Sequence, residues 1–131
     1  MLFVDTGAWF ALSVASDPDH ERAKAVVAEN DAPLITTDYV VDELLTLFVV
    51  RRQRLKGVEW VHDILDGQGV DLIRITTDDF EEACRIYMRF SDKEWSFTDC
   101  TSYVAMRRMQ LPMAFSFDAH FHEFGTVQVV P

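Results

Sequence analysis

Short apolar runs alternate with longer amphipathic segments along the whole chain. The runs are rich in β-branched and aromatic residues and are bounded by turn-forming residues, as is typical of buried strands. They predict five strands, at residues 2–5, 34–37, 70–76, 113–118 and 126–130. The intervening segments repeat apolar residues every three to four positions and predict helices directly after residue 5 and at residues 20–30, 39–55, 57–65, 77–87 and 97–110.

Strands that alternate with helices favour a mostly parallel sheet with helices on both faces. We therefore expect an α/β fold, a three-layer α/β/α sandwich built on a roughly five-stranded sheet. Asp38 is expected to cap the helix that follows it, and Gly57 to open the next helix. The run Thr77-Asp78-Asp79 is expected to cap the helix at residues 77–87. Residues 119–125, AHFHEFG, are expected to form a short turn between the last two strands.

The bulk composition predicts one ordinary globular domain that spans residues 1–131. Hydrophobic residues make up 49% of the chain and charged residues 26%, with no repeat, linker or low-complexity run. Cys84 and Cys100 stand alone, and a chain of this length needs no disulfide, so we expect both to be small buried side chains. The chain runs from Met1 directly into a short strand, which favours a cytoplasmic protein without a membrane span.

The net charge of −10 gives the chain no general attraction for nucleic acid or for an anionic membrane. Two local basic clusters run against this charge, one at residues 51–56 and one formed by Arg107 and Arg108. Either cluster guides a nucleic-acid strand or is a solvated helix end favoured by the helix dipole, and the sequence leaves both interpretations open.

Four acids lie far apart in sequence, each next to an apolar segment: Asp5, Glu43, Asp99 and Asp118. Two of them end predicted strands, and the other two lie in the first turns of predicted helices. In a sheet with right-handed crossovers every connecting helix begins at the edge where strands end, and ligands bind at that edge. We therefore expect all four carboxylates to meet at one edge of the sheet.

Helical geometry separates Glu43 from its neighbour Asp42. Glu43 lies at the border of the apolar face, beside Val40 and Leu47, whereas Asp42 points away from that face. Glu43 is therefore the candidate site residue. Asp99 lies on the side of its helix that carries Tyr103 and Met106, away from the arginines, so its carboxylate is expected to be partly desolvated.

A divalent metal ion is the expected partner of these acids. Two carboxylates about 4 Å apart repel by roughly 4 kcal/mol at an effective dielectric of about 20, and a hard cation removes that cost. Mg²⁺ and Mn²⁺ prefer oxygen ligands, which suits a set of acids without His or Cys. A single Asp after a strand is as often a helix cap. Thr6, Ser96 and Thr98 are secondary candidates that orient a ligand or cap a helix equally well.

The segments that carry these acids, LFVDTGAW, VVDELL, WSFTDCTSYVAM and FSFDAHF, resemble the four acidic motifs of PIN domains, above all the small VapC-type toxins. The resemblance covers essentially the whole chain. It implies a metal-dependent endoribonuclease, usually a homodimer, that is silenced by a cognate antitoxin protein. Asp5, Glu43 and Asp99 match the three core metal-site acids and Asp118 the more variable fourth. The implied chemistry is attack of a metal-activated water on an RNA phosphodiester.

Other interpretations remain open at this stage. A housekeeping PIN-type RNA-processing nuclease and a non-catalytic module whose acidic groove receives a basic partner both fit the acids. An aspartyl-phosphate mechanism is disfavoured because no lysine follows a strand. Packing is the expected role of three aromatic residues, Trp9, Phe10 and Trp95, although they could also stack bases. Surface or packing roles are also expected for the four histidines, His20, His62, His120 and His122.

Overall fold

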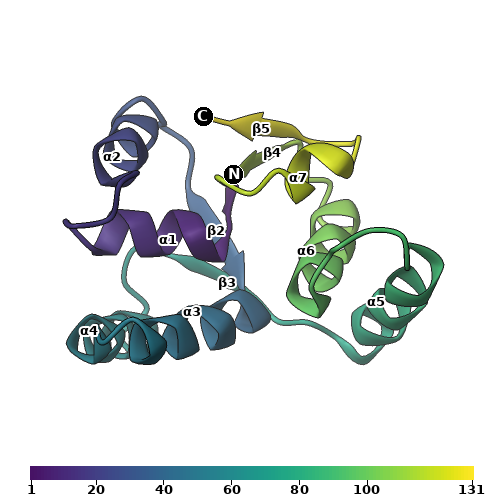
Figure 1. The fold of residues 1–131 in the computed structure, drawn as a ribbon, viewed down its shortest axis with the longest axis horizontal. Helices are drawn as coiled ribbons and strands as arrows, with labels where there is room; N and C mark the ends of the chain where they lie inside the picture. The colour runs from purple at the N-terminus through teal and green to yellow at the C-terminus, as the bar shows by residue number, and fades with distance from the viewer.

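Five parallel strands form one sheet in the order β3-β2-β1-β4-β5 in the computed structural model, which describes residues 1–131 (Figure 1). Every predicted strand is present, although most are shorter than their apolar runs. The strands are β1 Leu2–Val4, β2 Leu34–Thr37, β3 Asp71–Ile73, β4 Met113–Phe115 and β5 Gln128–Val130.

Seven helices connect the strands and cover both faces of the sheet, as a three-layer α/β/α sandwich requires. In Figure 1, α1 and α2 lie to the left of the strands and α5 and α6 to the right. The helices are α1 Thr6–Ser13, α2 His20–Ala28, α3 Asp38–Val50, α4 Arg54–Leu65, α5 Thr77–Arg89, α6 Phe97–Arg108 and α7 His120–Glu123. The expected turn between the last two strands therefore contains one short helix, α7.

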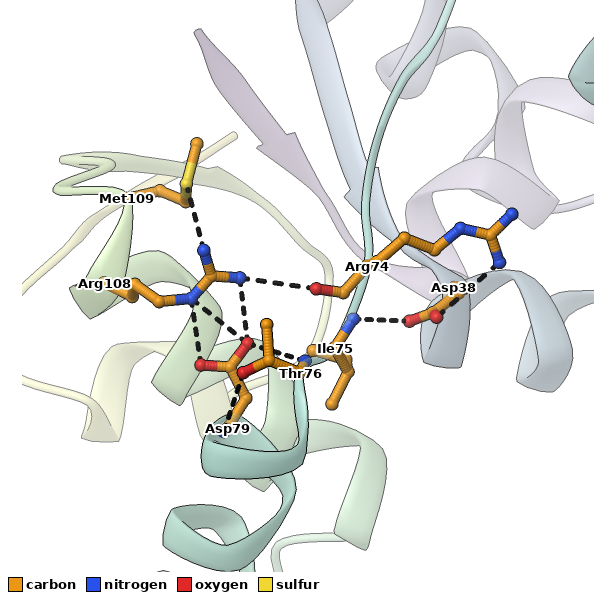
Figure 2. Close-up of polar contacts among 7 residues, drawn as sticks. All are labelled: Asp38, Arg74, Ile75, Thr76, Asp79, Arg108 and Met109. Atoms are coloured by element: carbon orange, nitrogen blue, oxygen red, sulfur yellow. Dashed lines mark hydrogen bonds and ion pairs between the residues drawn. The ribbon is translucent and has the colours of Figure 1, made fainter.

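The caps differ from the expected ones in two places. Thr37, not Asp38, caps α3, because its side-chain oxygen accepts a hydrogen bond from the backbone N–H of Val40. Asp38 instead accepts a hydrogen bond from the backbone N–H of Ile75 and so ties α3 to the segment after β3 (Figure 2). The cap of α5 is Thr76, one residue earlier than expected.

Gly57 lies inside α4 and does not open it, because the helix already begins at Arg54. A Cβ atom at Gly57 would lie 3.5 Å from the side chain of Phe48 on α3. That distance is an ordinary van der Waals contact, so a side chain would fit at this position and the approach of α3 to α4 does not depend on the glycine.

The apolar core lies between the central strands and the helices that face them. Phe3, Val4 and Phe115 are fully buried in β1 and β4. Helix α6 is buried on most sides, as its sequence predicted. The three aromatic residues named above are also buried, and Trp9 packs edge-on against Trp60 with ring centroids 4.6 Å apart. Packing is thus the role that the structure gives to Trp9, Phe10 and Trp95.

The second basic cluster is largely structural. The Arg108 guanidinium donates hydrogen bonds to both carboxylate oxygens of Asp79, at 2.8–3.1 Å, and to the backbone carbonyl of Arg74 (Figure 2). This contact joins the end of α6 to the beginning of α5. Arg107 lies over the ring of Tyr103 on its own helix. Both cysteines are free; Cys100 is buried as expected, whereas Cys84 on the amphipathic α5 is only partly buried.

Candidate functional site

The four predicted acids line one hollow of about 300 Å³ at the edge of the sheet where the parallel strands end. The sheet topology brings these distant acids together, because β1 lies between β2 and β4 and all three strands end at this edge. The lining residues are Asp5, Thr6, Gly7, Glu43, Leu47, Glu94, Ser96, Asp99, Asp118 and His120.

Asp5 is the most enclosed of the acids, with only 5% of its surface exposed. It follows β1 directly and occupies the cap position of α1. Burial raises the pKa of Asp5 to about 7; hydrogen bonds from the Thr6 backbone and the Ser116 hydroxyl oppose this rise, and the charges of Asp99 and Glu43 reinforce it. A carboxylate with such a pKa gains strongly from a cation beside it.

Asp99 lies in the first turn of α6 and is 6% exposed. It forms a capping box with Ser96, since the Ser96 hydroxyl accepts from the Asp99 backbone and the Asp99 carboxylate accepts from the Ser96 backbone. Burial raises the pKa of Asp99 and the charge of Asp118 adds to this effect, although hydrogen bonds from Ser96 and His120 oppose it. The capping role and a place in the hollow therefore coexist in one side chain.

Helix α3 brings Glu43, and not Asp42, to the hollow. Glu43 is half-buried and lines it, whereas Asp42 is exposed and does not. This is the placement that the helical wheel predicted.

Asp118 lies in the loop after β4, not at the end of the strand as expected, because β4 ends at Phe115. The Asp118 backbone N–H donates to the Ser116 hydroxyl at 3.0 Å, and the Asp118 carboxylate accepts from the His120 backbone N–H at 2.9 Å. This tight turn directs the acid back into the hollow, where it is the most exposed of the four.

The three secondary candidates, Thr6, Ser96 and Thr98, do not all lie at the hollow. Thr6 and Ser96 line the hollow, and Thr98 does not. The hydroxyl oxygen of Thr6 is buried without a hydrogen-bond partner, which is unusual for a buried polar atom. Ser96 acts as the cap of α6.

Sequence reasoning missed three residues of this site: Ser116, Glu94 and His120. The Ser116 hydroxyl donates to Asp5 at 3.0 Å while it accepts from the Asp118 backbone, so it joins two of the acids. Glu94 is an additional exposed acid on the rim. The only sequence signal was position, since Ser116 and His120 each stand two residues from Asp118.

His120 lies among the acids, which differs from the surface or packing role expected for it. Its Nδ1 is 3.1 Å from a carboxylate oxygen of Asp99 and 3.4 Å from one of Asp118. Burial acts to lower the pKa of His120, but the hydrogen bond to Asp99 and the charges of Asp118 and Asp99 outweigh it and raise the pKa.

The residues of the hollow fit a divalent cation. Carboxylates supply oxygen donors, and an unpartnered hydroxyl at Thr6 lies beside them. One oxygen of Asp99, one of Asp118 and one ring nitrogen of His120 lie within 4.8 Å of one another. The basic clusters do not line this hollow.

Residues 2–127 match the model of the PIN domain family. The chain belongs to the PIN domain family. It is 34% identical, over all of its 131 residues and 99% of the relative's length, to the 23S rRNA-specific endonuclease VapC20 of Mycobacterium tuberculosis. The predicted family is therefore confirmed, and so is the α/β fold that it implies.

Solved structures give the same family and fold. The crystal structure of the Mycobacterium tuberculosis VapC20 toxin, which cleaves the sarcin–ricin loop, superposes with a TM-score of 0.91 at 32% identity and full coverage of both chains. A toxin–antitoxin complex from Klebsiella pneumoniae superposes with a TM-score of 0.67 at 13% identity, over 100% of this chain and 97% of that one. The latter likeness concerns the fold alone. No helix of the protein is long and apolar enough to span a bilayer.

Proposed function

We propose that this PIN domain protein is an endoribonuclease of the VapC type, a toxin that hydrolyses RNA phosphodiester bonds and is held inactive by a cognate antitoxin. The observation that carries the proposal is the convergence of Asp5, Glu43, Asp99 and Asp118 on one hollow. Full-length identity of 34% to a named rRNA endonuclease supports the same activity.

Mg²⁺ or Mn²⁺ is the cofactor of the proposed reaction. Asp5, Asp99 and Asp118 would hold the ion directly or through water, with Glu43 at a second position or in a water network. When bound, the ion would supply Lewis acidity and lower the pKa of a water molecule at the scissile phosphate. The charge of the ion would also offset the repulsion between the acids and phosphate.

The residues around the acids fix their positions. Ser116 holds Asp5 and the Asp118 turn in register across β1 and β4, and Ser96 holds the Asp99 carboxylate through the capping box. Preorganised ligands of this kind are what metal-assisted hydrolysis needs, because a displaced carboxylate loses the ion.

Structured ribosomal RNA is the substrate class to test first. VapC20 is described as specific for 23S rRNA and as cleaving the sarcin–ricin loop, and it matches this chain from end to end. We assign the same class of substrate, a structured rRNA hairpin, to this protein.

The antitoxin is the second proposed partner. Solved structures similar in fold include complexes of toxin with antitoxin from Klebsiella pneumoniae and VapBC2 from Rickettsia felis. A basic or arginine-bearing segment of such a partner would complement the acidic hollow and exclude RNA from it.

The decisive test is cleavage of a panel of RNAs, including a 23S rRNA hairpin, with Mn²⁺ or Mg²⁺ and with a chelator. Cleavage is expected only with metal, and Asp5→Asn and Asp99→Asn are expected to reduce it by more than about 100-fold. Glu43→Gln is expected to impair cleavage, whereas the exposed neighbour Asp42→Asn is the matched control and should leave it unchanged.

Chelator-resistant cleavage would contradict the metal assignment. Full activity of both Asp5→Asn and Asp99→Asn would remove the nuclease proposal and leave the acidic hollow as a protein-binding surface. Unchanged growth of a host that expresses the protein without its antitoxin, despite cleavage in vitro, would favour a housekeeping nuclease over a toxin.

A further inference from the structure

His120 presents one ring nitrogen to the acids on which the proposed function rests. Nδ1 makes both contacts, at 3.1 Å to Asp99 and 3.4 Å to Asp118, and the imidazole side chain is 25% exposed. His120 is the one residue with a side-chain nitrogen among those that line the hollow. An all-oxygen site requires no such residue.

We propose that His120 binds the catalytic cation directly through Nδ1, so that the site has mixed nitrogen and oxygen ligands and selects Mn²⁺ over Mg²⁺. The proposal rests on the metal-dependent function above and adds a ligand to it. Imidazole nitrogen is a good ligand for transition metals, whereas Mg²⁺ favours carboxylate and water oxygens.

The spacing of the three groups fits this role. Adjacent ligands of an octahedral ion, each about 2.1 Å from the metal, lie about 3 Å apart. The separations of Nδ1 from the Asp99 and Asp118 oxygens are 3.1 and 3.4 Å, close to that value. The two carboxylate oxygens lie within 4.8 Å of each other, so the spacing of all three atoms is compatible with one coordination sphere.

The backbone and core hold the ring in this position. His120 is the first residue of α7, and its backbone N–H donates to the Asp118 carboxylate at 2.9 Å. The next residue, Phe121, is fully buried and stacks on Phe3 of β1 with ring centroids 6.1 Å apart. The imidazole thus stands on a short helix that is anchored in the core, which is how a preorganised ligand is built.

A purely orienting role is the competing explanation. In that case Nδ1–H would donate to Asp99 and hold the carboxylate, and His120 would never contact the ion. The two roles differ in whether nitrogen lies in the coordination sphere of the metal.

Pulsed electron paramagnetic resonance of the Mn²⁺-loaded protein separates the two roles without any activity measurement. A directly bound imidazole gives ¹⁴N modulation, and labelling the histidines with ¹⁵N shifts its frequency. We expect this modulation in the wild-type protein and in His122→Ala, whose exposed histidine on the same short helix is the matched control. We expect it to disappear in His120→Ala.

Equilibrium titrations with the metals alone give the second readout. His120→Ala is expected to weaken Mn²⁺ binding by about 10-fold to 100-fold and Mg²⁺ binding by less, so that the preference for Mn²⁺ falls. Circular dichroism checks that the variant is folded. Should it not fold, the ¹⁵N-labelled wild-type and His122→Ala proteins still decide whether histidine is bound.

The outcomes separate failure of this inference from failure of the proposed function. Tight Mn²⁺ binding without histidine modulation, or equal losses of Mn²⁺ and Mg²⁺ affinity in His120→Ala, would overturn the ligand role and leave the nuclease intact. Absence of any metal binding, together with no cleavage of the RNA panel, would overturn both.

Discussion

At the scale of single residues, the site combines groups that are costly to charge with groups that hold them in place. Asp5 is 5% exposed and has its pKa raised to about 7 mainly by burial. An acid whose pKa is raised on folding is destabilising wherever it must ionise in the folded protein. The metal-free protein therefore carries a penalty at neutral and alkaline pH.

Asp5→Asn is expected to stabilise the metal-free protein in a pH-dependent way. Below about pH 4 the acid is neutral in both states and the variant gains nothing. Between 3.8 and about 7 the unfolded acid ionises first, so the gain grows with pH and levels off above 7, with an upper limit on the order of 4 kcal/mol. Thermal unfolding in chelator at pH 4, 6 and 8 measures it. Identical pH profiles for variant and wild type would contradict the raised pKa.

Ser116→Ala is expected to weaken metal binding by about 10-fold to 100-fold, because the hydroxyl holds Asp5 and the Asp118 turn together. Ser102→Ala is the matched control, since Ser102 is equally buried but its hydroxyl has no hydrogen-bond partner. Its loss should leave metal affinity unchanged. Calorimetric titration of both variants with Mn²⁺ measures the difference, and equal affinities would argue against the bridging role.

The sequence was sufficient to choose among acids and insufficient to find their neighbours. Glu43 was separated from Asp42 by helical geometry alone, because the helix fixes which side each residue faces. Ser116 and His120 depend on how β4 pairs with β1 and on the tight turn that follows β4. No local pattern encodes that pairing, so these two residues were visible only in the folded chain.

At the scale of elements, helices α5 and α6 are joined by an ion pair between the exposed Arg108 and the buried Asp79. Arg108 forms a two-pronged contact with Asp79, which also closes the capping box of α5 with Thr76 (Figure 2). Burial acts to raise the pKa of Asp79, but hydrogen bonds and charge from Arg108, with those from Thr76, outweigh it and lower the pKa. The pair thus fixes the helix that carries Asp99.

Asp79→Ala is expected to destabilise the protein by about 2–3 kcal/mol at neutral pH, since it removes one half of the capping box of α5 and the charged hydrogen-bond partner of Arg108. A lowered pKa means that the contribution is present above the unfolded value of 3.8 and is lost as pH falls through the lower folded value. Asp78→Ala, an exposed acid in the same first turn, is the control and should cost little. Urea unfolding of both variants at pH 7 and pH 3 measures these effects. Equal losses of stability in Asp79→Ala and Asp78→Ala at pH 7 would refute the role of the pair.

The existence and order of the elements followed from the sequence except for the short helix α7, whereas several boundaries did not. Alternating apolar runs and amphipathic segments fixed the five strands and the large helices, because burial imposes those periods. The beginning of α4 and the cap of α3 were predicted wrongly. Helix α4 already begins at Arg54, three residues before Gly57. Asp38 accepts a hydrogen bond from the distant Ile75 backbone, a contact that no local pattern encodes.

At the scale of the whole molecule, one face of α5 is apolar and open. Phe80, Tyr87 and Met88 are 42%, 56% and 69% exposed, beside a shallow hollow that Phe97 also lines. Exposed apolar side chains also lie on α3 and α4, where Val50, Leu55 and Leu65 are 68%, 81% and 78% exposed. The homodimer expected from the family resemblance has these two surfaces as candidate contacts, and the α5 surface is the one tested first.

Met88→Glu is accordingly expected to shift the protein toward the monomer, because it puts a charge into the proposed contact. Val50→Glu is the comparison variant, because Val50 is equally exposed, at 68%, on the apolar surface of α3 and α4. Sedimentation velocity across a range of concentrations measures the effect. A wild-type protein that is monomeric throughout, or equal behaviour of the two variants, would contradict a dimer through α5.

The strand order has a consequence for biosynthesis. The central strand β1 is made first, but its neighbour β4 lies near the other end of the chain, and Asp118 and His120 follow it. A ribosome must therefore translate past residue 120 before the last members of the acid cluster can reach Asp5. Nascent chains shorter than this lack them, so the proposed activity is delayed until that point of synthesis.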